Sequence, residues 1–167
     1  AIQSEAYRLF KYTPMRTANI LQRLYLDALI SYPRTSSQKL PETIGYKNIL
    51  RKIGKAAVYS EEANELLKKK VLKPNEGKKN DTAHPAIYPT GNLPQKQLDT
   101  EKNNLFDLIA KRLFATFGDP AIRQNITVEV GLNGKKFFCN GSQTTVEGWF
   151  RYYRPYVQLK DDDDLLN

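Results

Sequence analysis

The 167-residue sequence is poor in cysteine, histidine, methionine and tryptophan, with one of each. A single cysteine, Cys139, excludes an intramolecular disulfide framework and a cysteine-rich zinc site, and a single histidine, His84, excludes a metal centre of several imidazoles. No apolar run approaches the ~18 residues of a membrane-spanning helix, and the N-terminus lacks the apolar stretch of a signal peptide. These absences predict a soluble, cytoplasmic protein without structural zinc.

The chain is long enough to bury a core without disulfides or metals, and its length suits one domain, or one domain and part of another. It begins with Ala1, inside a segment that already has amphipathic character. This start predicts a piece cut from a longer protein.

The charge is positive and unevenly distributed. The formal net charge is +8, and residues 1–59 hold ten Lys and Arg against three Asp and Glu. A basic region of this kind is typical of proteins that bind polyanions, most often nucleic acid, although solubilising surface charge has the same composition. The lysine-rich stretch at 68–79 indicates a solvated loop. The acidic run Asp161 to Asp164 indicates a tail rather than a metal site, because adjacent carboxylates cannot converge on one ion.

The first 120 residues have helical patterns. Apolar spacing predicts helices at 2–11 and, after the N-cap Thr13 and Pro14, at 14–29. This pair resembles a helix-turn-helix, whose second helix contacts DNA in many DNA-binding proteins, and we therefore single out its polar residues Arg16, Gln22 and Arg23. Further helices are expected at 43–53, at 61–70 after the cap Ser60, and at 100–117.

Beyond residue 120 the pattern changes to strands. Ile126, Val128 and Val130 alternate with polar residues, and the Asn-Gly pairs at 133–134 and 140–141 predict two hairpin turns of a β-meander. Residues 149–156 interleave aromatics with arginines, which fits either base stacking or, more commonly, a half-buried strand. The sequence therefore predicts an α+β protein with a boundary near residue 120.

The segment YPRTSS at residues 32–37 carries the clearest chemical signal. In an extended backbone Tyr32 and Arg34 project to one side, with Pro33 opposite. A phenol has a reference pKa near ~10 and attacks phosphorus poorly at neutral pH, so it needs a nearby cation such as Arg34. The alternative is a strand tyrosine beside an exposed arginine.

YPRTSS, preceded by QRLY at 22–25 and ALIS at 28–31, resembles the active-site region of type IA DNA topoisomerases, especially archaeal topoisomerase I. The segment HPAIYPT at 84–90 is similar to that family's histidine motif, and EGW at 147–149 extends the resemblance to most of the chain. Where many bacterial members carry Asp, this chain has Ser36, so a carboxylate function there is absent or supplied elsewhere.

The resemblance implies that Tyr32 attacks one DNA strand, forming a 5′-phosphotyrosine link through which a second segment passes before resealing. It implies that Arg34 positions the tyrosine and stabilises the phosphate, and that His84 is a further phosphate or hydrogen-bonding residue. We expect DNA contacts from Arg16, Gln22, Arg23, Thr35, Ser36 and Ser37.

The same resemblance implies the overall organisation. Residues 1–120 form a helix-rich, winged-helix-like domain that carries the tyrosine, residues 121–159 form part of an antiparallel β domain framing the DNA hole, and residues 160–167 form an acidic tail. The magnesium ligands of the family lie in an N-terminal Toprim domain, outside this sequence, so we expect no metal or cofactor within the chain. The expected partner of the enzyme is single-stranded DNA, and the expected state is a nucleoid-associated monomer that relaxes negative supercoils.

Two other functions fit part of the pattern. A non-catalytic winged-helix module would use Arg16, Arg23 and Arg34 only to contact phosphates. A tyrosine recombinase also combines tyrosine with arginines, but its motif has more basic partners and it links the 3′-phosphate. The 167 residues alone are not expected to relax supercoiled DNA.

Overall fold

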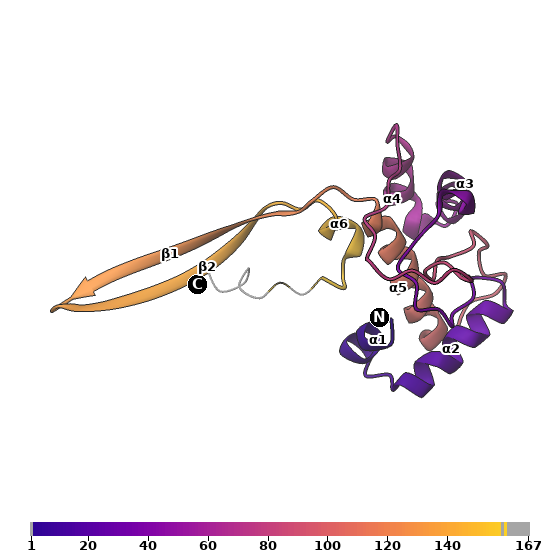
Figure 1. The fold of residues 1–167 in the computed structure, drawn as a ribbon, viewed down its shortest axis with the longest axis horizontal. Helices are drawn as coiled ribbons and strands as arrows, with labels where there is room; N and C mark the ends of the chain where they lie inside the picture. Colours follow the sequence, from indigo (N-terminus) through magenta and orange to yellow (C-terminus); the bar gives the residue numbers. More distant parts are fainter. Residues whose placement is uncertain (1, 158, 160–167) are drawn as a thin grey trace.

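The computed structural model describes residues 2–157 and 159, in which a helical body carries one long projecting β-hairpin (Figure 1). The predicted α+β class is confirmed. The elements in chain order are α1 (Ile2–Phe10), α2 (Pro14–Leu26), the 3-10 helix η1 (Glu42–Ile44), α3 (Tyr46–Ile53), α4 (Ala57–Leu67), α5 (Thr100–Thr116), β1 (Ile122–Leu132), β2 (Lys135–Val146) and α6 (Phe150–Tyr153).

The predicted pair of N-terminal helices is confirmed. The Thr13 side chain accepts a hydrogen bond from the Arg16 backbone N–H at 3.3 Å, and Pro14 is the first residue of α2. The proline needs no N–H there, because the first amides of a helix have no partner within it. The second helix ends at Leu26 rather than near Leu29, since Ala28 adopts a left-handed backbone conformation (φ 55°) that stops the helix.

The next two helices differ in part from the prediction. The expected helix at 43–53 is divided by Gly45 (φ 75°) into η1 and α3. Helix α4 begins at Ala57, so the prediction that it starts after a Ser60 cap is wrong. Ser60 lies inside the helix, where its hydroxyl donates to the Ala57 carbonyl at 3.1 Å. A serine hydroxyl can bond a backbone carbonyl of the preceding turn as readily as it can cap a helix. The presence of Ser60 in the sequence therefore does not determine where α4 begins.

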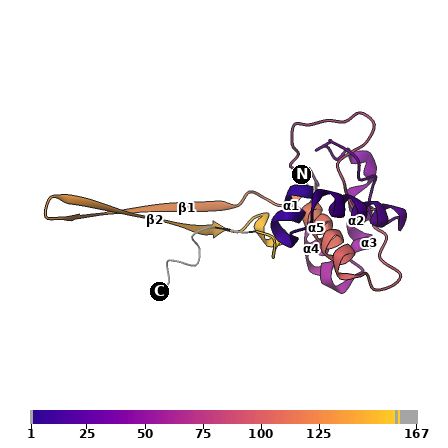
Figure 2. The ribbon, with the colours of Figure 1, turned by 90° about the horizontal axis from the view of Figure 1, so that it is seen from below.

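Helix α5 is the centre of the hydrophobic core. The Asp99 carboxylate caps it by accepting the Lys102 N–H at 2.8 Å. Helices α2, α4 and α6 pack against α5, and Figure 2 shows it among the helices of the body. Its buried side chains include Leu105, Ile109 and Phe114. Leu105 and Ile109 are apolar positions of one helix face in the sequence, and Phe114 lies beside that face.

The region after residue 120 is a single antiparallel hairpin within the described residues, not a meander. The turn at Asn133-Gly134 is confirmed, with both residues at positive φ. The second predicted turn is wrong, because β2 continues through Asn140 and Gly141, which pair with Thr127 and Ile126 of β1. An Asn-Gly pair forms a hairpin turn where the segments before and after it pair with each other. Here both segments belong to β2, and both pair with β1.

Residues 149–156 do not form the predicted strand, since α6 occupies 150–153. Tyr152, Tyr153 and Tyr156 are buried in the helical core, and the Tyr156 hydroxyl donates to Asp107 of α5 at 2.5 Å. Tyr152 and Tyr153 belong to α6, which packs against α5, and Tyr156 follows the helix and reaches α5 through its hydrogen bond to Asp107. The hypothesis that they stack on bases is not supported by this burial.

The expected division at residue 120 stays a prediction, as does the winged-helix comparison. The structure adds that residues 149–157 return from the hairpin to the helical body. The predicted acidic tail, 160–167, lies outside the described residues. Among the described helices none has the length and apolar character to cross a membrane.

Candidate active site

Tyr32 follows a sharp turn that comes directly after α2. The Leu29 N–H donates to the Leu24 carbonyl at 3.0 Å, and Leu29 and Ile30 are buried in the core. The Ala28 carbonyl accepts hydrogen bonds from the Thr90 hydroxyl at 2.7 Å and from the Asn92 side-chain amide at 3.0 Å. The turn and the two buried side chains therefore fix the point at which the tyrosine segment leaves the helical body.

A short antiparallel bridge joins the tyrosine segment to the histidine segment. Ile30 pairs with Pro89, the Ser31 N–H donates to the Tyr88 carbonyl at 2.9 Å, and the Tyr88 N–H donates to the Ser31 hydroxyl at 3.0 Å. Pro89 has no N–H to donate, so it can take part in the bridge only at a position whose N–H is not needed for a hydrogen bond. The pairing brings two segments far apart in the sequence into contact.

The bridge places Tyr32 against His84. Their ring centroids are 4.5 Å apart with an interplanar angle of 44°, and both residues are half-buried. Tyr25, near the end of α2, meets the Tyr32 ring edge-on at 5.5 Å. The sequence motifs did not indicate Tyr25 as part of this site, although it lies in the QRLY segment. The rings of His84 and Tyr25 restrict the Tyr32 phenol, and Tyr32 remains partly exposed.

Arg34 is exposed two residues after Tyr32. Within the described residues it makes no ion pair or hydrogen bond, so its guanidinium is available to an external anion. The predicted trio thus divides into a contacting pair, Tyr32 and His84, and a neighbouring cation, Arg34. That Tyr32 and Arg34 share one surface stays a prediction.

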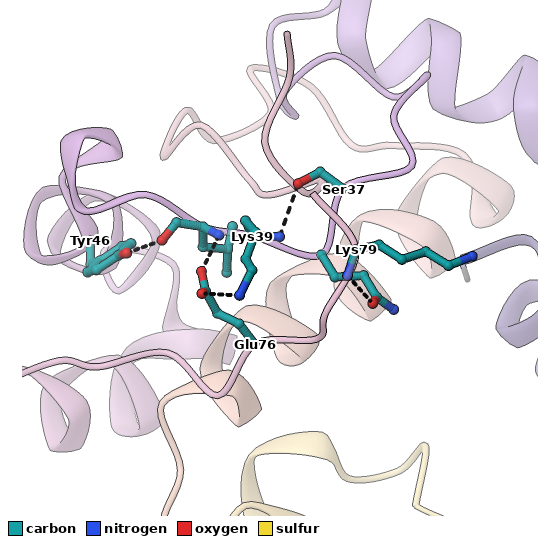
Figure 3. Close-up of polar contacts among 7 residues, drawn as sticks. Ser37, Lys39, Tyr46, Glu76 and Lys79 are labelled. Carbon is teal, nitrogen blue, oxygen red and sulfur yellow. Dashed lines mark hydrogen bonds and ion pairs between the residues drawn. The ribbon is translucent and has the colours of Figure 1, made fainter. Parts of the chain in front are cut away.

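Thr35 and Ser37 shape the loop that follows Tyr32. The Thr35 hydroxyl donates to the His84 carbonyl at 3.2 Å and accepts the Ser37 N–H at 3.0 Å. The buried Ser37 hydroxyl accepts the Lys39 N–H at 3.1 Å, a contact drawn in Figure 3, whereas Ser36 is exposed. Of the three residues predicted to contact DNA here, Ser36 is the most accessible.

The loop after Ser37 is held against a second loop at 76–79 (Figure 3). The Gln38 N–H donates to the Lys79 carbonyl at 2.8 Å, and the Glu76 carboxylate accepts the Leu40 N–H at 2.5 Å and the Lys39 ammonium at 3.3 Å. The Leu40 hydrogen bond, followed by Lys39, lowers the pKa of Glu76. Glu76 therefore stabilises the loop as an anion.

This lowered pKa gives a pH dependence of stability. The contribution of the Glu76 carboxylate to the free energy of unfolding is fully present above its unfolded-state pKa. It is lost as the pH falls through its lower folded-state pKa. We expect Glu76→Gln to lower the free energy of unfolding at about pH 7 and to have a diminishing effect toward about pH 3. Denaturant unfolding at several pH values measures this difference. Glu62→Gln in α4 is the control, and an equal, pH-independent effect of both changes would contradict the assignment.

Three predicted DNA-contacting residues, Arg16, Gln22 and Arg23, lie on α2. Arg16 and Arg23, with Asn19 between them, line a pocket of about 280 Å³. Arg16 is ion-paired with Glu101 of α5, and its guanidinium lies 4.9 Å from the centre of the Tyr12 ring. Gln22 is half-buried on the same helix. The helical period places Arg23 and Tyr25 on different flanks of α2, so the arginines do not share the immediate surface of Tyr32.

Comparison with known proteins places the chain in a family. A family model described as DNA topoisomerase matches residues 1–167. The chain belongs to the DNA topoisomerase family. DNA topoisomerase 1 of Methanocaldococcus jannaschii is 46% identical over 165 residues, which are 98% of this chain and 21% of that protein. DNA topoisomerase 1 of Pyrococcus horikoshii is 42% identical over 161 residues, which are 96% of this chain and 24% of that protein.

A more distant similarity is to DNA topoisomerase 3 of Schizosaccharomyces pombe, which is 27% identical over 151 residues, or 90% of this chain and 24% of that protein. The chain thus spans about a quarter or less of the length of these topoisomerases. The resemblance that rests on the tyrosine and histidine motifs is confirmed at the level of the family.

In the described part of this topoisomerase chain, no three or more His, Cys, Asp or Glu side chains are grouped so that they could hold a metal ion. No step below depends on a metal bound by these residues.

Proposed function

We propose that this chain is the tyrosine-bearing part of a type IA DNA topoisomerase that cleaves and rejoins one DNA strand and thereby relaxes negative supercoils. The contact between Tyr32 and His84, with Arg34 exposed beside it, is the observation that carries the proposal. It brings together a nucleophile, a hydrogen-bonding imidazole and a permanent cation, which are the groups that attack on a phosphodiester requires.

In the proposed reaction the Tyr32 oxygen forms a bond to phosphorus, and the bond from phosphorus to the 3′ oxygen breaks. The phenol gives up its proton, the released 3′ oxygen takes one up, and the phosphate stays on Tyr32 as a 5′-phosphotyrosine. Arg34 stabilises the charge that develops on the phosphoryl oxygens, and His84 donates a hydrogen bond to them or orients the phenol. Attack by the 3′-hydroxyl reverses these steps and reseals the strand.

The DNA path proposed here begins at the tyrosine loop and continues onto α2. Ser36, Thr35 and Ser37 lie next to Tyr32, and Gln22 lies on the helix that precedes it. Arg16 and Arg23 are proposed to contact phosphates further along the strand, with Arg16 exchanging its Glu101 partner for a phosphate. We propose that the protein acts on single-stranded DNA as a monomer, in the cytoplasm and at the nucleoid, with Mg²⁺ held outside these residues.

The hairpin supports the proposal that the β domain is completed by other segments of a longer protein. One face of the hairpin carries exposed apolar side chains, among them Ile126, Val128, Val130 and Phe137. An apolar sheet face of this kind is normally covered. The resemblance assigns the cover to further segments of the same β domain.

The proposed function is tested on the full-length parent protein with single-stranded DNA and Mg²⁺. After denaturation and proteolysis, mass spectrometry is expected to find a nucleotide on the peptide that contains Tyr32. A nucleotide on another residue would refute the assignment of the nucleophile. DNA binding without any covalent adduct would favour the non-catalytic module instead.

The chain of 167 residues alone is expected not to relax supercoiled plasmid DNA, because the resemblance places the metal-binding carboxylates outside it. Gel electrophoresis of plasmid incubated with the purified chain and Mg²⁺ measures this. Full-length parent protein is the positive control. Robust relaxation by the chain alone would contradict the proposal that the metal-binding carboxylates needed for relaxation lie outside it.

A further inference from the structure

The Thr35 hydroxyl links the loop that leaves Tyr32 to the histidine segment. It donates a hydrogen bond to the His84 carbonyl at 3.2 Å and accepts one from the Ser37 N–H at 3.0 Å. Thr35 follows Tyr32 closely in the sequence, whereas His84 lies 49 residues further on. One hydroxyl therefore holds the tyrosine loop against the residue whose ring contacts the tyrosine ring.

Two further links join the same two segments. The Ala86 N–H donates to the Lys39 carbonyl at 2.8 Å. The Ser31 N–H donates to the Tyr88 carbonyl at 2.9 Å, and the Ser31 hydroxyl accepts the Tyr88 N–H at 3.0 Å. Both links are made beyond the histidine, on its C-terminal side. The Thr35 hydroxyl thus holds the end of the segment that carries the imidazole.

The chemistry of a hydroxyl limits what else Thr35 can bind. A threonine hydroxyl has one proton to donate, and here the His84 carbonyl accepts it. The phosphate oxygens of DNA accept hydrogen bonds and have none to donate, so Thr35 can donate to DNA only by releasing His84. The side chain is also half-buried, whereas that of Ser36 is exposed. The hydroxyl is therefore better suited to hold the histidine than to contact the phosphate.

We propose that Thr35 is a positioning residue, whose hydroxyl sets the orientation of His84 to Tyr32 for cleavage and rejoining. The inference rests on the proposed function, because it concerns the same reaction. The His84 and Tyr32 ring centroids are 4.5 Å apart, so a shift of the His84 backbone changes the geometry of the pair. Small displacements of reacting groups have large kinetic effects. Loss of the hydroxyl therefore slows the chemical step more than it weakens DNA binding.

The test uses the full-length parent protein with Mg²⁺ and measures single-turnover formation of the covalent adduct on a single-stranded oligonucleotide. Thr35→Val keeps the branched shape of the side chain and removes its hydrogen-bond donor and acceptor. It is expected to slow adduct formation by about tenfold to a hundredfold, while the Kd for the oligonucleotide changes by less than about twofold.

Thr35→Ser separates the hydroxyl from the rest of the side chain. Serine keeps the donor and the acceptor and loses only the methyl group, so this variant is expected to retain the rate to within about threefold. Thr82→Val is the matched control, because Thr82 is an exposed threonine two residues before His84. It is expected to leave both the rate and the Kd unchanged.

A wild-type rate in Thr35→Val would overturn the inference, as would an equal slowing by Thr35→Ser or by Thr82→Val. A slower rate in Thr35→Val with an equal loss of DNA binding would also overturn it, since Thr35 would then contact the DNA. Tyr32→Phe in the same assay separates the two proposals. If it abolishes the adduct while Thr35→Val has no effect, only the inference about Thr35 fails.

Discussion

Replacing Tyr32 with phenylalanine is expected to abolish the covalent protein–DNA adduct in the full-length parent protein. The change removes the one oxygen that can attack phosphorus from this position, while the ring keeps its contact with His84. We expect the rate of adduct formation to fall by at least about a thousandfold, as for other removed nucleophiles. Affinity for single-stranded DNA is expected to change by less than about twofold, because phosphate contacts supply most of the binding.

Tyr25→Phe is the matched control for this prediction. Tyr25 contacts the Tyr32 ring edge-on at 5.5 Å and is itself exposed, so it is the neighbouring hydroxyl most able to replace the nucleophile. Its variant keeps the ring contact and is expected to retain adduct formation to within about threefold. If Tyr32→Phe still formed the adduct, or if Tyr25→Phe abolished it, Tyr32 would not be the nucleophile.

Replacing Phe114 with alanine is expected to destabilise the folded chain by about 3–5 kcal/mol. Phe114 is fully buried in α5, and its ring lies 5.9 Å from that of Tyr59 in α4. The substitution leaves a cavity at the centre of the helical body, where α2, α4 and α6 pack against α5 and cannot all close the gap. Denaturant unfolding of the 167-residue chain, monitored by circular dichroism, measures the loss.

Phe137→Ala is the matched control, because it removes the same side chain from the projecting hairpin. Phe137 is 55% exposed in β2, so we expect its loss to cost less than about 1 kcal/mol in this chain. Equal effects of the two substitutions would show that the hairpin contributes to the cooperative core, contrary to the arrangement in Figure 1.

The helices with strong local signals could be predicted from the sequence. The Thr13 cap and Pro14 define the start of α2, and the apolar face of α5 defines its length. These signals work because capping and amphipathic spacing involve residues only a few positions apart. The end of α2 was less predictable, since Ala28 is an ordinary helix former that takes a left-handed conformation here (φ 55°).

The wrong predictions of secondary structure concern residues whose structural partners are distant in the sequence. Tyr156 is buried in the helical core, where Asp107 of α5 accepts its hydroxyl hydrogen bond, and no pattern within 149–156 contains that information. Asn140 and Gly141 have the composition of a turn but lie in β2, because β1 supplies the ladder opposite them. Tertiary pairing thus overrides local preference in both places.

The candidate site shows the same limit. Tyr32, Arg34 and His84 were identified by motif resemblance, and periodicity alone did not bring the tyrosine and the histidine together. Thr35 and His84, whose hydrogen bond closes the site, are 49 residues apart in the sequence.

The polarity of the covalent link tests the central claim most directly. Full-length parent protein is incubated with Mg²⁺ and a single-stranded oligonucleotide labelled at its 3′ end or its 5′ end, and the products are denatured and separated. Attack by Tyr32 with a 5′-phosphotyrosine intermediate predicts that the 3′ label stays on the protein and that the 5′-labelled piece is released with a free 3′-hydroxyl. Retention of the 5′ label on the protein would mean a 3′-phosphate link and would contradict the account.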